Sequence, residues 1–371
     1  TLGRRLADAL PDVAVTRCPT GGLADWTATH FASGRVLVFI GSVGLAVRAI
    51  APHVASKTTD PAVVVVDETG RFAVPILSGH IGQANTWARR IAQALGAEPV
   101  VTTATDSRGV FAVDDWATRL GLKIANPERI KAVSAALLAG RTVRLASEFP
   151  IAGPPPAGVV PDPDRWDVIV SCRQAPADAL HLVPPAVTAG IGCRRGTRED
   201  VIERAFGAAL DAAGYHPASV AQVCSIDLKA REPGLVAFCE RRGLPLRTFS
   251  AEELGGVQGA FGASDFVAAT VGVDNVCERA AALGSGGYLV AAKAARDGVT
   301  VALALREPRL RFDALDLGDS DQGCDQDSDQ DSAPNSDQGR DQNSDQNQDQ
   351  NSDQDSTQNS DQDRDSDREV A

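Results

Sequence analysis

The sequence predicts two α/β domains with mainly parallel sheets, joined by a small middle α/β module and followed by a disordered C-terminal tail. Short apolar runs alternate with segments of helical periodicity from residue 36 to 148, and the alternation begins again at residue 187. A proline-rich stretch at 149–166 separates the two patterns. From residue 319 the side chains are almost all Asp, Gln, Asn and Ser, which cannot bury enough apolar surface to offset their ordering entropy. The predicted boundaries are 1–110 for the first domain, 111–186 for the middle module with its linker, 187–306 for the last domain and 319–371 for the tail.

The first domain is predicted to begin with a helix and a strand in "TLGRRLADALPDVAV". We expect the first strand of its sheet, ahead of that helix, to be missing. The apolar runs and their glycine or proline ends predict further strands at 36–41, 62–68, 71–77 and 99–106. Helical spacing predicts helices at 44–52 and 82–96, the second with Gly96 past its end.

The middle module is predicted to hold two helices, near 112–120 and 127–139, and two strands, near 141–147 and 167–172, before a linker near 182–186. The last domain is predicted from the same signals. Its strands are expected at 220–227 and 246–250, its helices at 198–214, 232–242, from 251 and at 271–284, and its hairpin at 288–304 around "RDG".

Composition excludes several classes of protein. The tail from Asp319 holds 17 of the 49 acidic residues and 3 of the 36 basic residues, so the net charge of −13 belongs to the tail and the rest is nearly neutral. A basic footprint for nucleic acid is therefore absent, and no apolar run reaches the length of a membrane span. The seven cysteines are scattered without a CxxC pair, which argues against a zinc site and a disulfide framework and fits a reducing cytoplasm.

One glycine-rich loop, "GIGCRRGT" from Gly190 to Thr197, is expected to follow a strand and open a helix. Glycines allow the backbone to approach an anion, a helix N-terminus offers free N–H groups, and two arginines add charge. The spacing matches neither a dinucleotide nor a P-loop fingerprint. The alternatives are an anion site and a tight turn with exposed arginines. For Cys193 inside the loop, the alternatives are a thiolate nucleophile and a small buried side chain.

Two further stretches place polar residues after predicted strands. In "IDLKAREPG", Asp227, Lys229 and Glu232 could supply a proton donor and an electrophile, or could cap the next helix. In "TTATDSRG", Asp106 could bind an anion or orient a base, or could belong to a helix cap.

The stretch "LSGHIGQAN" sets His80 between glycines, after a strand and before a helix. The glycines suggest unusual backbone angles and room for a ligand. A neutral imidazole there could be a general base near pH 7. A structural histidine at a turn is the alternative.

Taken together, several of these segments resemble the cobalamin biosynthesis protein CbiG family. The resemblance covers roughly residues 34–305, and its motifs occur in the family's order: "GLAVRAIAPHVASKTTDPAVVVVDETGRF", "LSGHIGQANTWARRIAQALGAEPVVTTATD" with "VDDWA", "GIGCRRGT", "SIDLKAREPGLVAFCERRGLPL", "FSAEEL", "VGVDNVCERAAAL" and "GVTVALA". Such a family implies an N-terminal, a middle and a C-terminal domain. The Asp/Gln/Ser tail has no counterpart in the family.

The resemblance implies the reaction of a cobalt-precorrin-5A hydrolase. In that reaction the δ-lactone of cobalt-precorrin-5A is opened and acetaldehyde is expelled, giving cobalt-precorrin-5B. The substrate is a cobalt-containing tetrapyrrole, no separate cofactor or protein-bound metal is implied, and other enzymes of the cobalamin pathway are possible partners.

Lactone opening requires an activated water and a stabilised oxyanion. His80 is the expected water-activating base, Lys229 or an arginine is expected near the oxyanion, and Asp227 is a further catalytic candidate. The expected substrate-binding residues, which would grip the peripheral carboxylates, are Ser78, Gly79, Gly82, Asn85, Asp106, Gly190, Gly192, Cys193, Arg194, Arg195, Gly196, Thr197 and Glu232.

Two rival hypotheses remain at this stage. A non-catalytic corrinoid-binding or carrier protein would bind the tetrapyrrole and release no acetaldehyde. A phosphate- or nucleotide-binding α/β enzyme would use "GIGCRRGT" as its anion loop, although the Walker and Rossmann patterns are absent.

Overall fold

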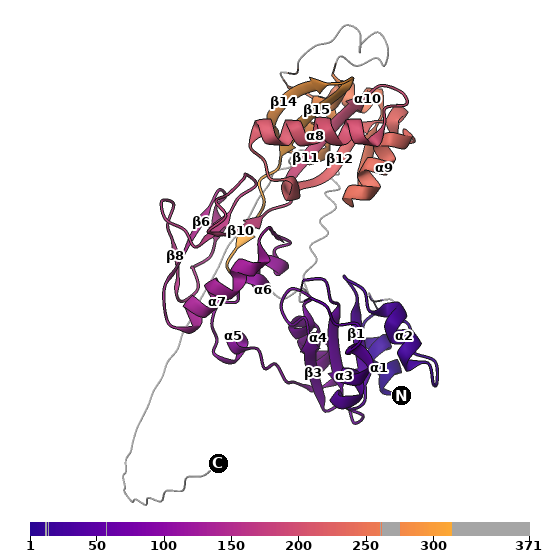
Figure 1. Cartoon of the computed structure of the whole chain (residues 1–371), viewed down its shortest axis with the longest axis vertical. Coiled ribbons are helices and arrows are strands. Elements are labelled where there is room, and N and C mark those ends of the chain that lie inside the picture. Colours follow the sequence, from indigo (N-terminus) through magenta and orange to yellow (C-terminus); the bar gives the residue numbers. More distant parts are fainter. Residues whose placement is uncertain (12, 14, 57, 260, 262–274, 314–371) are drawn as a thin grey trace, which may run out of the picture. The chain divides into compact units, whose positions relative to one another are not determined.

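The structure is a computed structural model that describes residues 1–313 except 12, 14, 57, 260 and 262–274. The tail expected at 319–371, and residues 271–274 of one expected helix, lie outside the described residues. The described residues form three sheets of four or five strands and one small two-stranded sheet (Figure 1).

The first sheet has the order β1-β2-β3-β4, with β1 (Val36–Ile40), β2 (Ala62–Val66), β3 (Phe72–Leu77) and β4 (Glu98–Pro99). The pairs β1–β2 and β3–β4 are parallel, whereas β2 and β3 are antiparallel. The reversal is local, because the turn "TG" joins β2 directly to β3 and leaves no room for a crossover helix.

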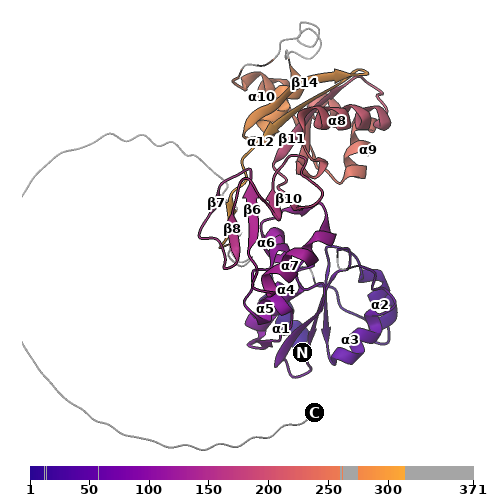
Figure 2. The ribbon, with the colours of Figure 1, turned by 60° about the vertical axis from the view of Figure 1, so that its left-hand side comes forward.

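Helices cover both faces of this sheet, as the alternation along β2 requires. Val64 and Val66 pack with α1 (Leu2–Ala9) and α4 (Ala84–Leu95). Val63 and Val65 pack with α2 (Leu23–His30) and α3 (Val43–Ile50) on the opposite face. Figure 2 shows α1 and α4 on one side of the sheet and α2 and α3 on the other.

Two predictions for this domain were wrong. The strand expected at 99–106 is only β4, and the chain from Ala104 to Ser107 forms the short helix α5. Among the described residues of the segment after α1, Val13 and Val15–Thr20, there is no strand. The other predicted strands and helices of the domain are confirmed within a few residues.

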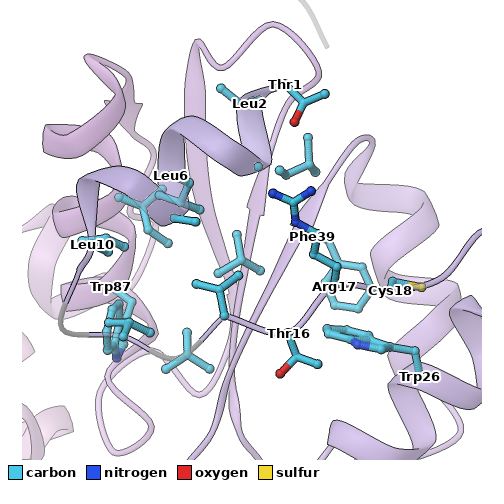
Figure 3. Close-up of a pocket in the computed structure, with 18 of the residues that line it drawn as sticks. Thr1, Leu2, Leu6, Leu10, Thr16, Arg17, Cys18, Trp26, Phe39 and Trp87 are labelled. Carbon is cyan, nitrogen blue, oxygen red and sulfur yellow. The ribbon is translucent and has the colours of Figure 1, made fainter.

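An apolar cavity of about 510 Å³ lies beside the free edge of β1, which among the described strands pairs only with β2. Figure 3 shows Leu6, Leu10 and Trp87 on one side of it and Phe39 and Trp26 on the other. The expectation of a further strand ahead of α1 stays a prediction.

The middle module is built on a second sheet of order β5-β10-β9-β6-β8. Its strands are β5 (Lys123–Ile124), β6 (Val143–Ser147), β8 (Val159–Pro161), β9 (Val168–Val170) and β10 (Leu180–Val183). All neighbours are parallel except β5 and β10. Its helices are α6 (Val113–Arg119), the 3-10 turn η1 (Pro127–Arg129) and α7 (Ile130–Leu138). The predicted linker near 182–186 is therefore partly strand.

The chain returns to this module after the last domain. Strand β16 (Leu310–Arg311) pairs with β7 (Ile151–Ala152) in a small separate sheet. The indole Nε1 of Trp116 donates to the carbonyl of Arg311 over 2.9 Å, and Phe312 stacks on the same indole.

The third sheet has the order β13-β12-β11-β15-β14. Its strands are β11 (Val187–Cys193), β12 (Val220–Ile226), β13 (Leu246–Phe249), β14 (Tyr288–Arg296) and β15 (Val299–Leu305). The first three are mutually parallel, and β15 runs antiparallel between β11 and β14 as the predicted hairpin.

Helices also cover both faces of the third sheet. One pair is α8 (Glu199–Ala213) and α9 (Pro233–Arg242), and the other is α10 (Ala251–Gly256) and α12 (Val276–Ser285). Figure 2 shows the two pairs on opposite sides of the strands. The strands β11 and β12 end at loops that carry several of the candidate residues: Arg194–Thr197 after β11, and η3 (Asp227–Lys229) with Glu232 after β12.

Candidate functional site

The loop that carries His80 connects the end of β3 to the start of α4. Ser78 and Gln83 adopt positive φ angles of 55° and 66°, and the two glycines expected to do so, Gly79 and Gly82, do not. The glycines are needed for space instead, because a Cβ on Gly82 would lie 2.4 Å from the Cβ of Ser78. The carbonyls of Ser78 and Gly79 accept the first N–H groups of α4, so this helix end is capped by its own loop.

His80 is held between two carboxylates. Its Nε2 lies 3.0 Å from Oδ2 of Asp106, and its Nδ1 lies 3.1 Å from Oδ1 of Asp114. The side chains of His80, Asp106 and Asp114 are 14%, 20% and 9% exposed, so water screens these pairs weakly. Both ring nitrogens therefore have a carboxylate to which a protonated imidazole can donate.

Asp106 is the centre of the cluster. Its Oδ1 accepts from Arg89, and its Oδ2 accepts from His80, Thr103 and Asn85, the last over 3.1 Å. The amide of Asn85 also donates to the hydroxyl of Thr103. We call these residues the His80 cluster: His80, Asn85, Arg89, Thr103, Asp106 and Asp114.

The cluster shifts two pKa values in opposite directions. Burial lowers the pKa of His80, but the hydrogen bonds and negative charges of Asp114 and Asp106 outweigh it and raise that pKa to about 9. Burial raises the pKa of Asp106, but hydrogen bonds from Thr103, His80 and Arg89 lower it to about 2. At neutral pH the arrangement is an imidazolium between two ionised carboxylates, which is suited to donating a proton or stabilising negative charge.

A second group of candidates meets around Glu232, in the third sheet. Its Oε1 accepts from the backbone N–H of Gly196 over 2.7 Å, and its Oε2 accepts from Nζ of Lys229 over 2.8 Å. The side chains of Lys229 and Glu232 are only 15% and 6% exposed. The hydrogen bond from Lys229, followed by that from Gly196, lowers the pKa of Glu232. Glu232 therefore ties the loop after β11 to the loop after β12.

The arginines of the loop are open to solvent. Arg194 and Arg195 are exposed, and neither has an ion-pair partner in the part of the chain that the structure describes. The aliphatic part of Arg194 lies against Gly298 at the turn of the hairpin. We call Arg194–Thr197 the arginine loop. It can offer guanidinium groups to a carboxylate without first breaking an ion pair.

Several expected site residues serve the fold. Gly190 and Gly192 lie inside β11 rather than in a loop, and a Cβ on Gly190 would lie 1.8 Å from the carbonyl oxygen of Cys277. The first turn of α8 carries two acids, Glu199 and Asp200, and their negative charges disfavour an anion at this helix end.

The surroundings of two other candidates, Cys193 and Asp227, bear on their expected roles. Burial raises the pKa of the Cys193 thiol, which favours the small, partly buried side chain over the thiolate nucleophile. Asp227 is exposed at the start of η3, and its backbone carbonyl accepts from Ala230. Asp227 does not take part in the contacts around Glu232 given above.

Sequence reasoning missed three members of the His80 cluster: Arg89, Thr103 and Asp114. Arg89 could have been found, because it lies four residues after Asn85 and so on the same face of α4. Thr103 stands three residues before Asp106 in the quoted "TTATD". Asp114 was inside the quoted "VDDWA" motif, but only the packing of α6 brings it to His80.

Metal-ligand clusters and membrane-spanning helices are absent from the described residues. No group of three or more His, Cys, Asp or Glu side chains there is arranged to hold a metal ion. No helix in the same residues is long and apolar enough to cross a membrane. The six described cysteines are free thiols.

Comparison with known proteins gives three adjoining family matches. Residues 25–106 match the cobalamin synthesis G N-terminal model, residues 111–184 the cobalamin biosynthesis central region, and residues 187–304 the cobalamin synthesis G C-terminus. The chain is 36% identical over 301 residues to the cobalt-precorrin-5A hydrolase of Salmonella typhimurium, covering 77% of this chain and 86% of that protein. The chain belongs to the cobalamin synthesis G family.

Two further proteins align with most of the chain. The cobalt-precorrin-5A hydrolase of Priestia megaterium is 33% identical over 302 residues, covering 74% of this chain and 79% of that protein. A crystal structure of a cobalamin biosynthesis protein G homolog from Sulfolobus solfataricus covers 82% of this chain and 93% of its own at 21% identity, with a TM-score of 0.37.

The three family regions place the two groups of residues. His80 and Asp106 lie in the N-terminal region of the cobalamin synthesis G family, and Asp114 lies in the central region. The His80 cluster therefore joins two family regions. The arginine loop and Glu232 lie in the C-terminal region.

Proposed function

We propose that this chain is a hydrolase of cobalamin biosynthesis that opens the δ-lactone of cobalt-precorrin-5A, releasing acetaldehyde and giving cobalt-precorrin-5B. The observation that carries the proposal is the identity with the Salmonella typhimurium cobalt-precorrin-5A hydrolase, which extends over most of both chains. The His80 cluster supports it, because it concentrates proton-transfer groups in one partly buried place.

In this proposal His80 acts as a cation. The role of water-activating base requires a neutral imidazole. The neighbouring carboxylates raise the pKa of His80 to about 9 and so keep the ring protonated below that pH. The imidazolium is instead suited to donate to the oxyanion that forms when water attacks the lactone carbonyl, and then to protonate the departing ring oxygen. For this, the substrate exchanges places with one of the two carboxylates, and the freed carboxylate takes the proton of the attacking water.

The arginine loop is proposed to bind the substrate. The tetrapyrrole periphery carries acetate and propionate side chains, and guanidinium groups pair with carboxylates through two parallel hydrogen bonds. Arg194 and Arg195 are free to do so. Lys229 is proposed to position the loop through Glu232, because its ammonium is already neutralised by that carboxylate.

No cofactor of the protein's own is required by this proposal, because cobalt enters with the substrate. Turnover should therefore survive dialysis of the enzyme against EDTA before the substrate is added. Loss of activity on dialysis, restored by a divalent metal, would refute this part.

The test is incubation of the purified chain with cobalt-precorrin-5A without oxygen, followed by mass spectrometry of the tetrapyrrole and trapping of acetaldehyde. The proposal expects the tetrapyrrole to take up one water and to lose acetaldehyde, a net loss of C2H2, with trapped acetaldehyde in an amount equal to the product. A carrier protein would bind the substrate, visible as a shift of its absorption spectrum, and release no aldehyde. That result would replace the hydrolase by the carrier hypothesis.

A further inference from the structure

A second cavity, with a volume of about 550 Å³, lies in the third sheet's domain at the amino ends of the parallel strands. Thr188 near the start of β11, Gln222 near the start of β12 and Arg247 near the start of β13 line it. The antiparallel β15 ends at the same edge, and the chain that leaves it contributes Arg306 and Arg309.

This cavity is separate from the arginine loop. The strand β11 is seven residues long and connects the two places, running from Val187 beside the cavity to Cys193 beside the arginine loop. At about 3.3 Å per residue the two ends of the strand are roughly 20 Å apart. A carboxylate bound at Arg194 therefore cannot also be bound in the cavity.

The cavity has a net positive charge, because three arginines and one glutamate line it. Three guanidinium groups line it, from Arg247, Arg306 and Arg309, and within the described chain none of them has an ion-pair partner. One carboxylate lines it, that of Glu307, and the hydroxyl of Tyr288 lies 3.5 Å from this carboxylate. An anion in this cavity would be attracted by each of the three guanidinium groups.

The polar side chain of Gln222, which lines the cavity, already has hydrogen-bond partners within the protein. The amide Nε2 of Gln222 donates to the carbonyl of Gly284 over 2.7 Å and to the hydroxyl of Thr188 over 3.2 Å. The Gly284 carbonyl belongs to the last turn of α12, so Gln222 satisfies a group that would otherwise present negative charge. Among the described residues, the side chains of Arg306 and Arg309 are then without an ion-pair partner, whereas the guanidinium of Arg247 lies 5.1 Å from the ring centroid of Phe249.

Two connecting segments meet at this cavity. Pro185 and Ala186 lead from β10 into β11, and Arg306–Arg309 lead from β15 to β16, back to the middle module. The N–H of Arg306 donates to the carbonyl of Ala186 over 3.1 Å, so the two segments are already hydrogen-bonded. A ligand held by Arg306 and Arg309 on one segment would pack against the other.

We propose that this cavity is a second binding site, for a compact anion with two or more clustered carboxylates. Arginine is suited to such groups because each guanidinium can bind one carboxylate through two hydrogen bonds. A volume of about 550 Å³ is within the usual range for a small-molecule site. The carboxylates belong either to a free small polycarboxylate or to side chains of a tetrapyrrole. The site does not rest on the proposed hydrolase activity.

The test is isothermal titration calorimetry of the full chain with citrate at low ionic strength. We expect one citrate per chain, at least tenfold tighter than acetate, with affinity that falls as salt is added. The double variant R306Q/R309Q should bind citrate at least tenfold more weakly. The control R204Q removes an exposed arginine that pairs with Asp200 on α8, and should bind as the parent does.

The single variant R247Q gives the same readout if the double variant does not fold. Equal citrate affinity in the parent and the arginine variants, or no citrate binding by the parent, would overturn the proposal. A second titration with uroporphyrin, a tetrapyrrole with carboxylate side chains, separates the two sources. Weaker uroporphyrin binding by R306Q/R309Q assigns the cavity to tetrapyrrole side chains, and unchanged binding assigns it to a free polycarboxylate.

Discussion

The His80 cluster and the arginine loop are both rich in charge, but their charges are used in opposite ways. In the His80 cluster each cation faces a carboxylate, and Asp106 accepts from four donors. In the arginine loop, the backbone of Gly196 is held by Glu232, which also pairs with Lys229, while Arg194 and Arg195 have no ion-pair partner among the described residues.

The difference indicates a division of work. A closed set of charges fixes a protonation state and a geometry, which is what a proton-transfer step requires. Exposed guanidinium groups on a loop held in place lose little free energy when they exchange water for a carboxylate, which is what substrate binding requires. Changes in the His80 cluster should therefore affect turnover and stability, and changes at the open arginines should affect affinity.

The largest effect is expected for His80→Ala. It leaves Asp106 and Asp114 without their shared cation, and it removes the proposed proton donor. Turnover should fall by about 10²- to 10⁴-fold, and the free energy of unfolding by roughly 3 kcal/mol. Acetaldehyde release and urea denaturation measure the two. The control His53→Ala, at a histidine that contacts the ring of Phe31, should retain turnover. Unchanged turnover in His80→Ala would remove His80 from the mechanism.

The next effect is the pH dependence of stability. Since the folded pKa of His80 is raised from 6.5 to about 9, its contribution is complete below about pH 6.5 and is lost as pH rises through 9. The Asp106 pKa is lowered from 3.8 to about 2, so its contribution is present above pH 3.8 and lost as pH falls through 2. The alkaline loss is on the order of 3 kcal/mol. Urea denaturation between pH 6 and 10 should show it in the parent and not in His80→Gln; equal slopes would contradict the pairing.

Glu232→Gln should have a smaller effect, in the other region. The variant leaves Lys229 mostly buried without a negative partner and weakens the bond to the Gly196 N–H. Stability should fall by about 1–3 kcal/mol, with KM raised because the arginine loop is less well held. The matched control is Glu253→Gln in the exposed capping box of α10, where a loss below about 1 kcal/mol is expected. Equal losses at both positions would mean that Glu232 does not brace the loop.

The substitutions Arg194→Gln and Arg195→Gln should change affinity alone. Each removes one open guanidinium, so KM should rise about tenfold, equivalent to about 1.4 kcal/mol, while kcat is kept. The unfolding free energy should stay within about 0.5 kcal/mol of the parent, because no ion pair is lost. Added salt should raise KM of the parent more than KM of the variants. A fall in kcat with unchanged KM would reverse the division of work.

The smallest effect is expected for Cys193→Ser. Burial raises the pKa of this thiol, so it is protonated at neutral pH and is a poor nucleophile. Turnover should remain within about twofold of the parent, and iodoacetamide at pH 7 should not inactivate the parent. Complete loss of turnover in a folded Cys193→Ser protein would restore the thiol as a catalytic candidate.

The sequence predicted elements whose signals are local. The amphipathic pattern and Gly96 marked α4, and "RDG" between two apolar runs marked the β14–β15 hairpin. The strand expected at 99–106 failed, although its residues favour strands, because strand pairing ends with β4 at Pro99 and Thr103 hydrogen-bonds Asp106 at the start of the helix α5. Propensity was overridden there by a local side-chain contact.

The candidate site was predictable within each motif and not between motifs. Asn85 and Asp106 were singled out with His80, and all three are in contact through Asp106. The contact between His80 and Asp114 spans 34 residues and depends on where α6 packs, which no local pattern encodes. The expected base role of His80 assumed a neutral ring, and the second carboxylate is what changes that expectation.

The proposed mechanism depends on the charge state of His80, which can be measured by ¹⁵N NMR of the full chain labelled at histidine. The two ring nitrogen shifts of His80, assigned by comparison with His80→Gln, report directly whether both nitrogens carry protons. The account predicts a doubly protonated ring at pH 7 with a midpoint near 9. A neutral ring at pH 7, with a midpoint at or below 6.5, would contradict it and return His80 to the role of a base.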